Sequence, residues 1–421
     1  MKIAIIGGGS TYTPEVIDGL LQLGGELGLT ELVLMDIDDH RLAVVGDFAK
    51  RMVAHAGGAF QVTTTKDRRA AIDGASFVLS QFRVGGQQAR HQDILLGLRH
   101  DLIGQETTGI GGMAKALRTL PVTMDICRDV REVAPNAWII NFTNPSGLIT
   151  EAILNHTECR CIGLCNVPLE MKMVIARFLG VEDHEVLLDS VGLNHLGWVR
   201  KIVVKGEDVT PRLLELLASE SGPANIPDMD FAPELIRALN AVPLYYNRFY
   251  YNTERVLANL KAKPKTRAQE VMEIEEKLLR KYRDPKQVIK PAELDQRGGA
   301  FYSKIAVELI DAIVNDRGVQ HVVNVKNAGA IPNLPADNVV EIASTIDKNG
   351  ATPLPTAPLE PSMFALIARA KAYEQLTIRA ALEQSYDQAF KAIFTNPLGP
   401  TADRARQVLD DLLQVNLLRY S

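Results

Sequence analysis

The first two dozen residues place the strongest restriction on the fold of this chain. An apolar run at residues 2–6 leads directly into Gly7, Gly8 and Gly9, and a helical pattern follows at residues 14–23. Glycine allows a sharp turn and a close approach to the backbone, and a helix N-terminus attracts the charge of a phosphate. A strand, a glycine turn and a helix in this order are typical of an α/β fold that binds a dinucleotide. A tight turn without a ligand is the alternative.

Strand-like runs continue to alternate with helical patterns through the first part of the chain. Alternation of this kind predicts a doubly wound parallel sheet with helices on both faces. The further strand-like runs are residues 31–38, 60–65, 75–82, 137–145 and 160–165, and a clear helical pattern lies at residues 40–55.

The pattern changes after about residue 181. Two strand-like runs at residues 184–192 and 198–206 lie close together, and a helix-rich end covers residues 362–418. We therefore predict an α/β protein with a Rossmann-like domain over residues 1–168. An α+β, helix-rich domain over residues 169–421 is expected to carry substrate and subunit contacts.

Two stretches rich in proline and glycine interrupt the second half, at residues 219–230 and 349–361. Both residue types favour turns and are unfavourable inside helices and central strands. We expect both stretches to be surface loops.

Charge and cysteine content limit the classes of partner and compartment. The 421-residue chain has a formal net charge of −5, so it lacks the overall basic character that usually accompanies nucleic-acid binding. No apolar run approaches the length of about 18 residues needed to cross a membrane. The four cysteines are too few for a disulfide framework in a chain of this length. A reduced, cytoplasmic setting is expected.

An acidic residue closes the second predicted strand. Asp36 can accept hydrogen bonds from the ribose hydroxyls of a dinucleotide, which favours NAD over NADP. The turn departs from the G-x-G-x-x-G pattern, because Tyr12 stands where the third glycine would be. The residues expected to bind the cofactor are Gly7, Gly8, Gly9, Ser10, Thr11 and Asp36.

A cysteine and a histidine stand at ends of later predicted strands. Cys165 follows an apolar run, and His195 lies in the sequence "GLNHLGW". Thiolate sulfur and imidazole nitrogen suit a divalent transition metal if substrate oxygens complete the coordination. The alternative is a buried cysteine and an unrelated core histidine. Strand alternation is expected to place Cys159, Cys161 and Cys165 on one face, with the first two as packing residues.

Seven short blocks resemble glycoside hydrolase family 4, the NAD- and metal-dependent glycosidases. They follow in that family's order across most of the first 270 residues: "GGGSTYTP", "FRVGG", "GQETTGIGG", "NFTNPSG", "CNVP", "NHLGW" and "TRAQE". The later block "RGGAFYSKIA" is also similar. Members of this family are exceptions to the usual two-carboxylate chemistry of glycosidases.

The resemblance implies an unusual route to hydrolysis. NAD removes hydride from C3 of the sugar, and the resulting ketone makes the C2 proton acidic. A base removes that proton, the C1 substituent is eliminated, water adds, and the hydride returns. A divalent metal, usually manganese, holds the C2 and C3 oxygens as a Lewis acid.

The resemblance also implies roles for individual residues. Cys165 and His195 match the family's metal ligands. The base is a tyrosine, which our alignment places at Tyr246, with Tyr245 and Tyr250 as alternatives. A tyrosine needs a nearby cation to act at neutral pH, and the metal and Arg267 are the candidates. The residues that match sugar- and phosphate-contacting positions are Arg83, Glu106, Asn144, Asn166 and Arg267.

The residue after the metal cysteine divides the family by substrate. An aspartate there accompanies 6-phospho-α-glycosidases and a histidine often accompanies unphosphorylated substrates, whereas Asn166 resembles the 6-phospho-β-glucosidases. The expected substrate is a phosphorylated disaccharide or aryl glucoside. An amide cannot protonate the leaving group, so the acid stays open. For Arg267, a solvated helix start capped by Thr266 is the alternative.

Two other classes remain as rivals. A lactate- or malate-type dehydrogenase would share the N-terminal sheet and use His195 as a proton shuttle. An NAD-sensing module without enzymatic activity is the second. Neither requires Cys165, the tyrosines or manganese.

The resemblance further implies a homodimer or homotetramer.

Overall fold

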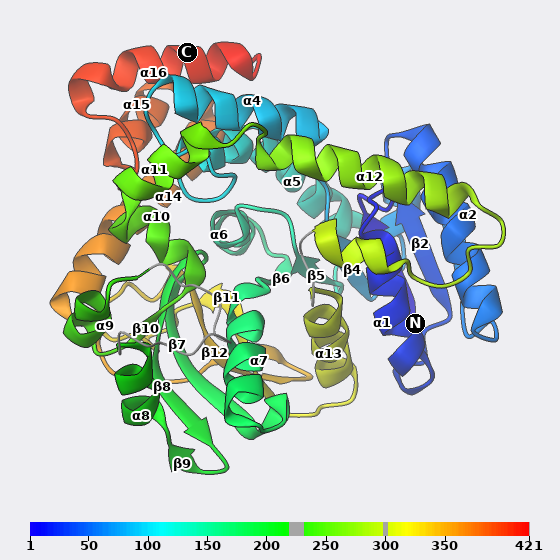
Figure 1. The fold of residues 1–421 in the computed structure, drawn as a ribbon. Helices are drawn as coiled ribbons and strands as arrows, with labels where there is room; N and C mark the ends of the chain where they lie inside the picture. The colour runs from blue at the N-terminus through cyan, green and yellow to red at the C-terminus, as the bar shows by residue number, and fades with distance from the viewer. Residues whose placement is uncertain (219–230, 298–301, 421) are drawn as a thin grey trace.

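One large sheet organises the computed structural model, which describes residues 1–218, 231–297 and 302–420 (Figure 1). Within those residues it has nine strands in the order β13-β12-β11-β6-β5-β4-β1-β2-β3. The strands from β6 to β3 are mutually parallel, which confirms the predicted doubly wound sheet. They are β1 (Lys2–Ile6), β2 (Glu31–Met35), β3 (Gln61–Thr65), β4 (Phe77–Ser80), β5 (Trp138–Asn141) and β6 (Arg160–Gly163).

The remaining strands of this sheet come from the second half of the chain and are antiparallel. They are β11 (Val319–Lys326), β12 (Val339–Asp347) and β13 (Gly350–Pro353). β11 joins β6 where Asn324 faces Gly163. The sheet therefore crosses the predicted domain boundary at residue 168, and that boundary stays a prediction.

One of the two predicted loops contains a strand. β13 lies inside residues 349–361, so the expectation of a loop is wrong for that part. β13 is the edge strand and pairs only with β12, so Pro353 does not interrupt a ladder on its outer side. The other predicted loop, residues 219–230, lies outside the described residues.

A smaller antiparallel sheet packs beside the large one. It consists of β7 (Val186–Leu193), β8 (Leu196–Val204), β9 (Glu207–Asp208) and β10 (Val242–Pro243). β7 and β8 confirm the two adjacent predicted runs. A tight turn formed by Asn194 and His195 connects them.

Helices cover both faces of the large sheet, as Figure 1 shows. Those of the first half are α1 (Thr13–Leu27), α2 (Asp39–His55), α3 (Arg68–Ile72), α4 (Gly86–Arg99), α5 (Ile110–Val133), α6 (Ser146–His156) and α7 (Val167–Leu179). Those of the second half are α8 (Thr210–Leu217), α9 (Pro233–Leu239), α10 (Arg248–Tyr251), α11 (Thr253–Ala262), α12 (Arg267–Arg283), α13 (Tyr302–Val314), α14 (Pro361–Glu383), α15 (Tyr386–Thr395) and α16 (Ala402–Val415). Short 3₁₀ helices lie at Asp183–Glu185, Tyr245–Asn247 and Ala292–Arg297.

The first strand shows how the core is divided. Ile3 and Ile5 belong to a hydrophobic cluster shared with α1, α2 and α13, whereas Ala4 and Ile6 belong to a second cluster shared with α5, α6 and the C-terminal helices. Successive side chains of a strand point to opposite faces, so a sheet covered on both sides needs a continuous apolar run. This requirement explains the unbroken apolar sequence before the glycines.

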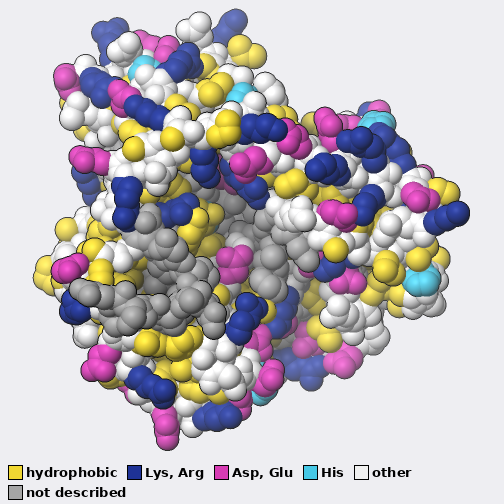
Figure 2. Space-filling model, viewed as in Figure 1, with side chains coloured by type: hydrophobic (Ala, Val, Ile, Leu, Met, Phe, Trp, Pro, Cys, Tyr) yellow, Lys and Arg dark blue, Asp and Glu magenta, His cyan; other side chains and the backbone are white. Residues whose placement is uncertain are grey.

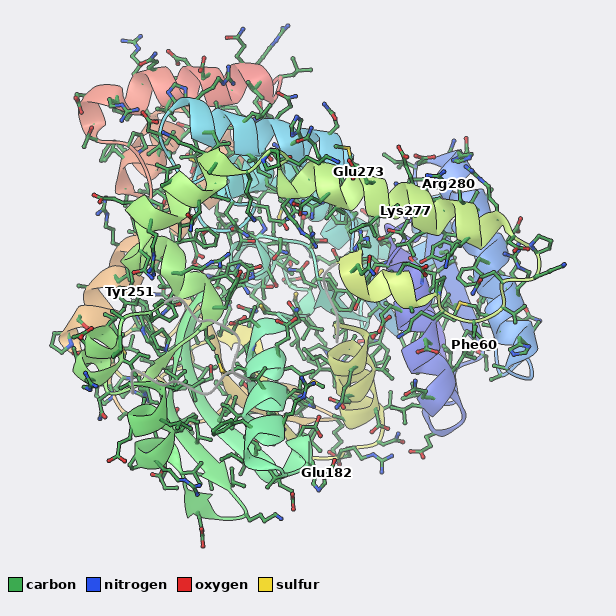
Figure 3. The ribbon with its side chains drawn as sticks, in the orientation of Figure 1. Phe60, Glu182, Tyr251, Glu273, Lys277 and Arg280 are labelled. Carbon is green, nitrogen blue, oxygen red and sulfur yellow. The ribbon has the colours of Figure 1, made fainter. Side chains whose placement is uncertain are left out.

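Helix α12 lies across the carboxyl end of the sheet, next to α4 and α2. Its residues Glu273, Lys277 and Arg280 are exposed on the outer side (Figure 3). Glu275 and Tyr282 are buried on the inner side. The helix therefore brings a buried carboxylate to the nucleotide-binding end of the sheet.

Three of the four cysteines serve the core. Cys127, Cys159 and Cys161 pack in the cluster beneath α5 and α6, which confirms the packing role expected for Cys159 and Cys161. The expectation that Cys165 shares their strand face is wrong, because β6 ends at Gly163. Cys165 packs in a separate cluster with Val167 and the smaller sheet.

Candidate active site

The glycine turn and Asp36 meet at the carboxyl ends of β1 and β2. Gly7 has a φ of 91°, and a Cβ there would lie 2.8 Å from the Cα of Phe82. The backbone N–H of Gly9 donates to Asp36 Oδ2 over 2.9 Å. A Cβ on Gly9 would lie 2.8 Å from that same oxygen. The turn therefore needs glycine at position 7, and a side chain at position 9 would displace the Asp36 carboxylate that adjacent parallel strands bring to it.

The residues after the glycines connect the turn to the second half of the chain. The hydroxyl of Tyr12, which replaces the third glycine, accepts a hydrogen bond from the backbone N–H of Ser303 over 3.1 Å. Thr11 is fully buried, and its hydroxyl accepts from Arg297 Nε over 2.7 Å. Ser10 remains partly exposed. Of the two predicted hydroxyls, Ser10 is thus the one at the surface of the turn.

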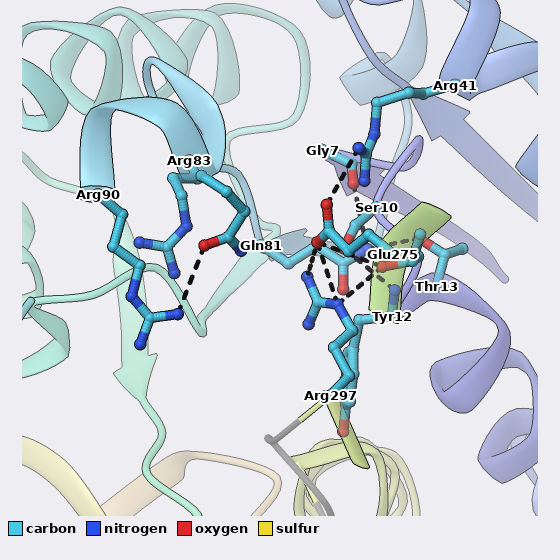
Figure 4. Close-up of polar contacts among 12 residues, drawn as sticks. Gly7, Ser10, Tyr12, Thr13, Arg41, Gln81, Arg83, Arg90, Glu275 and Arg297 are labelled. Atoms are coloured by element: carbon cyan, nitrogen blue, oxygen red, sulfur yellow. Dashed lines mark hydrogen bonds and ion pairs between the residues drawn. The ribbon is translucent and has the colours of Figure 1, made fainter. Parts of the chain in front are cut away.

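A buried charge cluster closes the far side of this turn (Figure 4). Glu275 forms ion pairs with Arg297 over 3.0 Å and with Arg41 over 3.2 Å. Burial alone would raise the pKa of Glu275, but the two guanidinium groups lower it below its usual value. Arg41 also donates to the backbone oxygen of Gly9 over 3.2 Å.

Sequence reasoning did not single out Arg41, Glu275 or Arg297. Arg41 and Glu275 lie 234 residues apart, and Arg297 lies 286 residues from Thr11, so no local spacing signals these contacts. The start of "RGGAFYSKIA" was the available hint for Arg297. Its next residues, 298–301, lie outside the described part of the chain. The cations at this turn and the start of α1 fit the pyrophosphate of NAD.

A second charge cluster surrounds Glu106, in the loop between α4 and α5. Its carboxylate contacts Arg83 and pairs with Arg90 and Lys115, each over 3.0 Å. Burial alone would raise the pKa of Glu106, but these three cations together hold it well below its usual value. Figure 4 places Arg83 and Arg90 on the opposite side of the view from the Glu275 cluster.

Arg90 and Lys115 were not predicted, although both are central to this cluster. The pKa of Lys115 is lowered to about 7, mainly by burial and also by the charge of Arg83, while Glu106 opposes the lowering. Burial also lowers the pKa of Arg90, and Tyr246 and Arg267 lie within its electrostatic reach. Three cations around one carboxylate leave an excess of positive charge that suits an anionic substrate.

The predicted metal ligands and base come together from three different elements. Cys165 follows β6, His195 lies in the β7–β8 turn with a φ of 65°, and Tyr246 lies in a 3₁₀ turn before α10. The rings of His195 and Tyr246 stack with centroids 3.7 Å apart and an interplanar angle of 10°. Cys165 packs in the same cluster as Tyr246, and its charge acts on the Tyr246 hydroxyl.

The three tyrosines weighed as the base have different surroundings. Tyr245 is 37% exposed, with the Arg248 guanidinium 3.9 Å from its ring centroid. Tyr250 interacts with Glu374 and Tyr373. Among the ring contacts of these tyrosines, the stack on His195 belongs to Tyr246. The geometry therefore favours Tyr246.

The hydroxyl of Tyr246 needs a cation before it can act as a base. Burial raises its pKa above its usual range, and the charges of Cys165 and Glu106 raise it further. Arg90 lowers it. Arg90 is thus an arginine whose charge favours the phenolate, and the roles expected for the metal and Arg267 stay predictions.

His195 and Cys165 fit a divalent metal. His195 Nδ1 is buried and has no hydrogen-bond partner within the described residues. Burial lowers the pKa of His195 to about 3, so the imidazole is neutral, as a metal ligand must be. No group of three or more His, Cys, Asp or Glu side chains suited to a metal occurs in the described ranges. The protein would thus supply two ligands and leave positions for substrate oxygens.

The remaining predicted substrate residues lie at helix starts. Asn166 precedes α7, and its amide donates to Glu170. Asn144 precedes α6 and accepts from the N–H of Ser146 over 3.3 Å. Arg267 begins α12 with its side chain 45% exposed, and it pairs with Glu270 over 3.0 Å. Thr266 caps that helix, so the solvated helix start describes the local geometry of Arg267.

Figure 2 shows Lys and Arg side chains interspersed with Asp and Glu side chains over the elements that surround the centre of the face seen in Figure 1. None of the helices in the described residues is long and apolar enough to cross a membrane. The Rossmann-type sheet and the glycine turn beside Asp36 define the class: an α/β protein with a dinucleotide-binding fold.

The chain belongs to glycoside hydrolase family 4. The model of family 4 glycosyl hydrolases matches residues 2–181, and the model of their C-terminal domain matches residues 190–399. Membership confirms the resemblance drawn from the seven sequence blocks and argues against the dehydrogenase and NAD-sensor alternatives.

Close relatives share nearly the whole length of the chain. A probable 6-phospho-β-glucosidase of Bacillus subtilis is 40% identical and covers 99% of this chain and 96% of its own. A phospho-α-glucosidase of Clostridium acetobutylicum is 30% identical over 99% of this chain and 97% of its own. The structure of the Thermotoga maritima 6-phospho-β-glucosidase with manganese, NAD⁺ and glucose 6-phosphate has a TM-score of 0.92, at 37% identity and complete coverage of both chains.

Proposed function

We propose that this protein is an NAD- and divalent-metal-dependent hydrolase of 6-phospho-β-glucosides. The observation that carries the proposal is the stack of His195 on Tyr246 beside Cys165, with a buried, unpartnered Nδ1. This group combines a thiol and an imidazole, both able to bind a metal, with a base, and ordinary two-carboxylate glycosidases do not need such a group. The 40% identity to a probable 6-phospho-β-glucosidase supports the β-substrate over the α-substrate of the 30% identical relative.

The residues divide the work between two sites. When bound, NAD supplies a reversible hydride acceptor for C3, and the metal supplies a Lewis acid for the C2 and C3 oxygens. Asp36 and the glycine turn orient the dinucleotide, while Cys165 and His195 hold the metal. Tyr246 removes the C2 proton, and Arg90 favours its phenolate form.

Recognition of the sugar falls to the cluster around Glu106. Arg83, Arg90 and Lys115 bring positive charge to a buried region, where a phosphorylated sugar gains from charge-assisted hydrogen bonds. Asn144, Asn166 and Arg267 complete the proposed set. Asn166 carries no titratable proton, so it can orient the glycosidic oxygen but cannot protonate it.

The preferred substrates are phosphorylated disaccharides or aryl glucosides, and the active form is a homodimer or homotetramer. We place the protein in the cytoplasm, because the four cysteines are free thiols and a metal-binding Cys165 must stay reduced.

Turnover of p-nitrophenyl β-glucoside 6-phosphate with NAD and Mn²⁺ under reducing conditions tests the proposal. The controls are the α-anomer, the unphosphorylated β-glucoside and omission of each cofactor. Hydrolysis of the phosphorylated β-substrate alone, lost without NAD or Mn²⁺, is expected. Preference for the α-anomer or the unphosphorylated sugar would reject the substrate assignment, and steady net NADH production would reject hydrolysis.

A further inference from the structure

The two metal ligands come from separately folded segments, so their spacing needs a physical cause. Cys165 follows β6 of the large sheet, whereas His195 lies in the turn of the smaller sheet. No strand pairing joins β6 to β7. A link between the two segments must therefore come from side chains or from a third element.

Such a link runs through a buried glutamate on β12. Glu341 is 2% exposed, and its Oε1 accepts hydrogen bonds from Asn194 Nδ2 and Asn324 Nδ2, each over 3.0 Å. Asn194 directly precedes His195. Asn324 faces Glu341 across β11 and β12 and faces Gly163 of β6 on its other side.

The link also reaches the segment that carries Cys165. Asn324 Nδ2 donates to the backbone oxygen of Gly163 over 3.4 Å, two residues before Cys165. Asn194 also influences the thiol, because it lowers the pKa of Cys165 against the raising effect of burial. Glu341 therefore holds two amides: that of Asn194, next to His195, and that of Asn324, which reaches the backbone of Gly163 ahead of Cys165.

Stability alone does not explain a carboxylate at this place. Within the described residues Glu341 has no ion pair, and its Oε2 lacks a hydrogen-bond partner. Burial raises the pKa of Glu341 to about 7, against the opposing effect of the two amides. An unpaired buried carboxylate is unfavourable compared with an apolar side chain of similar size.

Glu151 gives a comparison on helix α6, which packs against β12. It is 1% exposed, but it pairs with Lys371 over 2.6 Å and accepts from the backbone N–H of Val339 over 3.0 Å. Its contacts join α6, α14 and the start of β12 and do not approach either metal ligand. Glu151 therefore has an evident structural role, which Glu341 lacks.

We propose that Glu341 is a positioning residue for the metal site: through Asn194 and Asn324 it fixes the β7–β8 turn carrying His195 against the segment carrying Cys165. The inference rests on the proposed function, because it assumes that the two residues bind a metal. Outer-sphere groups that orient ligands commonly change metal affinity by about 10- to 100-fold when they are removed.

Titration of Mn²⁺ into the full-length protein tests this role without measuring turnover. The signal of free Mn²⁺ in electron paramagnetic resonance gives Kd in the presence of NAD and glucose 6-phosphate. Glu341→Ala is expected to raise Kd by about 10- to 100-fold. Glu341→Gln keeps an acceptor oxygen and is expected to stay within about threefold of the parent. Glu151→Ala, the matched control, is expected to lower Tm and leave Kd unchanged.

Each alternative result has a defined meaning. An unchanged Kd in folded Glu341→Ala, or a Glu341→Gln variant as weak as Glu341→Ala, would overturn the positioning role. If Glu341→Ala does not fold, Asn324→Ala removes one of the two amides and is expected to raise Kd by about 3- to 10-fold. An unchanged Kd in Asn324→Ala would then overturn the role. Failure of the parent protein to bind Mn²⁺ would instead reject the proposed function.

Discussion

The nucleotide end and the metal end of this enzyme are built in different ways. The glycine turn and Asp36 lie within the first 36 residues, and one pair of parallel strands brings them together. Glu106, Cys165, His195 and Tyr246 are spread over about 140 residues of sequence, and two sheets and a long loop bring them together. A site made from one local motif is readable in sequence, whereas a site assembled from distant segments depends on packing.

Residues from the second half of the chain also contact the nucleotide turn. Glu275 and Arg297 reach the nucleotide turn from the second half of the chain, and Arg297 contacts Thr11 directly. The local motif is therefore supported from a distance, much as Glu341 supports the metal ligands.

The largest effect is expected at the metal end. Tyr246→Phe should lower kcat by about 10²- to 10⁴-fold, because it removes the base without changing the stacked ring. The parent protein should exchange the C2 proton of the phosphorylated sugar with D₂O, which NMR can follow. The Tyr246→Phe variant should lose this exchange. Tyr245→Phe and Tyr250→Phe serve as controls and should retain exchange. Retained exchange in Tyr246→Phe would move the base to another residue.

Arg90 and Arg267 allow a buried and an exposed arginine to be compared in substrate binding. Arg90→Gln should raise KM for the phosphorylated substrate by about 10- to 100-fold, because it leaves the buried Glu106 with one cation fewer. Arg267→Gln should raise KM by only about two- to fivefold, because that side chain is 45% exposed and paired with Glu270. Steady-state kinetics of both variants measure which substitution raises KM more. The reverse ranking would mean that substrate binding rearranges α12.

The nucleotide end should respond less than the metal end. Asp36→Asn is expected to raise the Kd for NAD by about 10-fold, because the charged acceptor for the ribose is lost. Glu275→Gln should raise it by about two- to fivefold, through loosening of Arg41 and Arg297. Quenching of intrinsic fluorescence by NAD measures both. If Glu275→Gln has the larger effect, the site is not local and the contrast between the two ends disappears.

The smallest effect is expected for the pH dependence of stability at His321, on strand β11 of the large sheet. Burial lowers the pKa of His321 on β11 from 6.5 to about 4. Between these values the unfolded chain binds a proton that the folded chain does not, so this contribution to stability is complete above pH 6.5 and is lost as the pH falls toward 4. His321→Gln should therefore show a smaller fall in Tm between pH 7 and pH 5, by about 2 °C. Identical slopes for parent and variant would contradict this assignment.

The nucleotide fold was largely predictable. β1, β2 and the helices after them follow from apolar period and glycine position, because these signals act between neighbours in sequence. β13 was missed, since proline and glycine resemble a loop until an edge position makes them acceptable. The position of α12 next to α4 and α2 was also not predicted. Its amphipathic pattern shows that one side is buried but does not show which elements that side contacts.

The metal end shows the limit of sequence most clearly. Cys165, His195 and Tyr246 were identified through resemblance to the family, and their residue types alone left a buried thiol and a core histidine open. Arg90, Lys115 and Glu341 were not identified, because a charged residue at a single position resembles a solvated one until its burial is known.

By itself the sequence determined the parallel sheet, the glycine turn and Asp36, because each depends on residues that are neighbours in the chain or in adjacent strands. The tertiary structure alone decided that Arg90 supports Tyr246, that Glu275 closes the nucleotide turn, and that Glu341 lies between the two metal-bearing segments. Charges strengthen or weaken one another according to distance and burial, and both quantities are set only when the sheets and helices have packed.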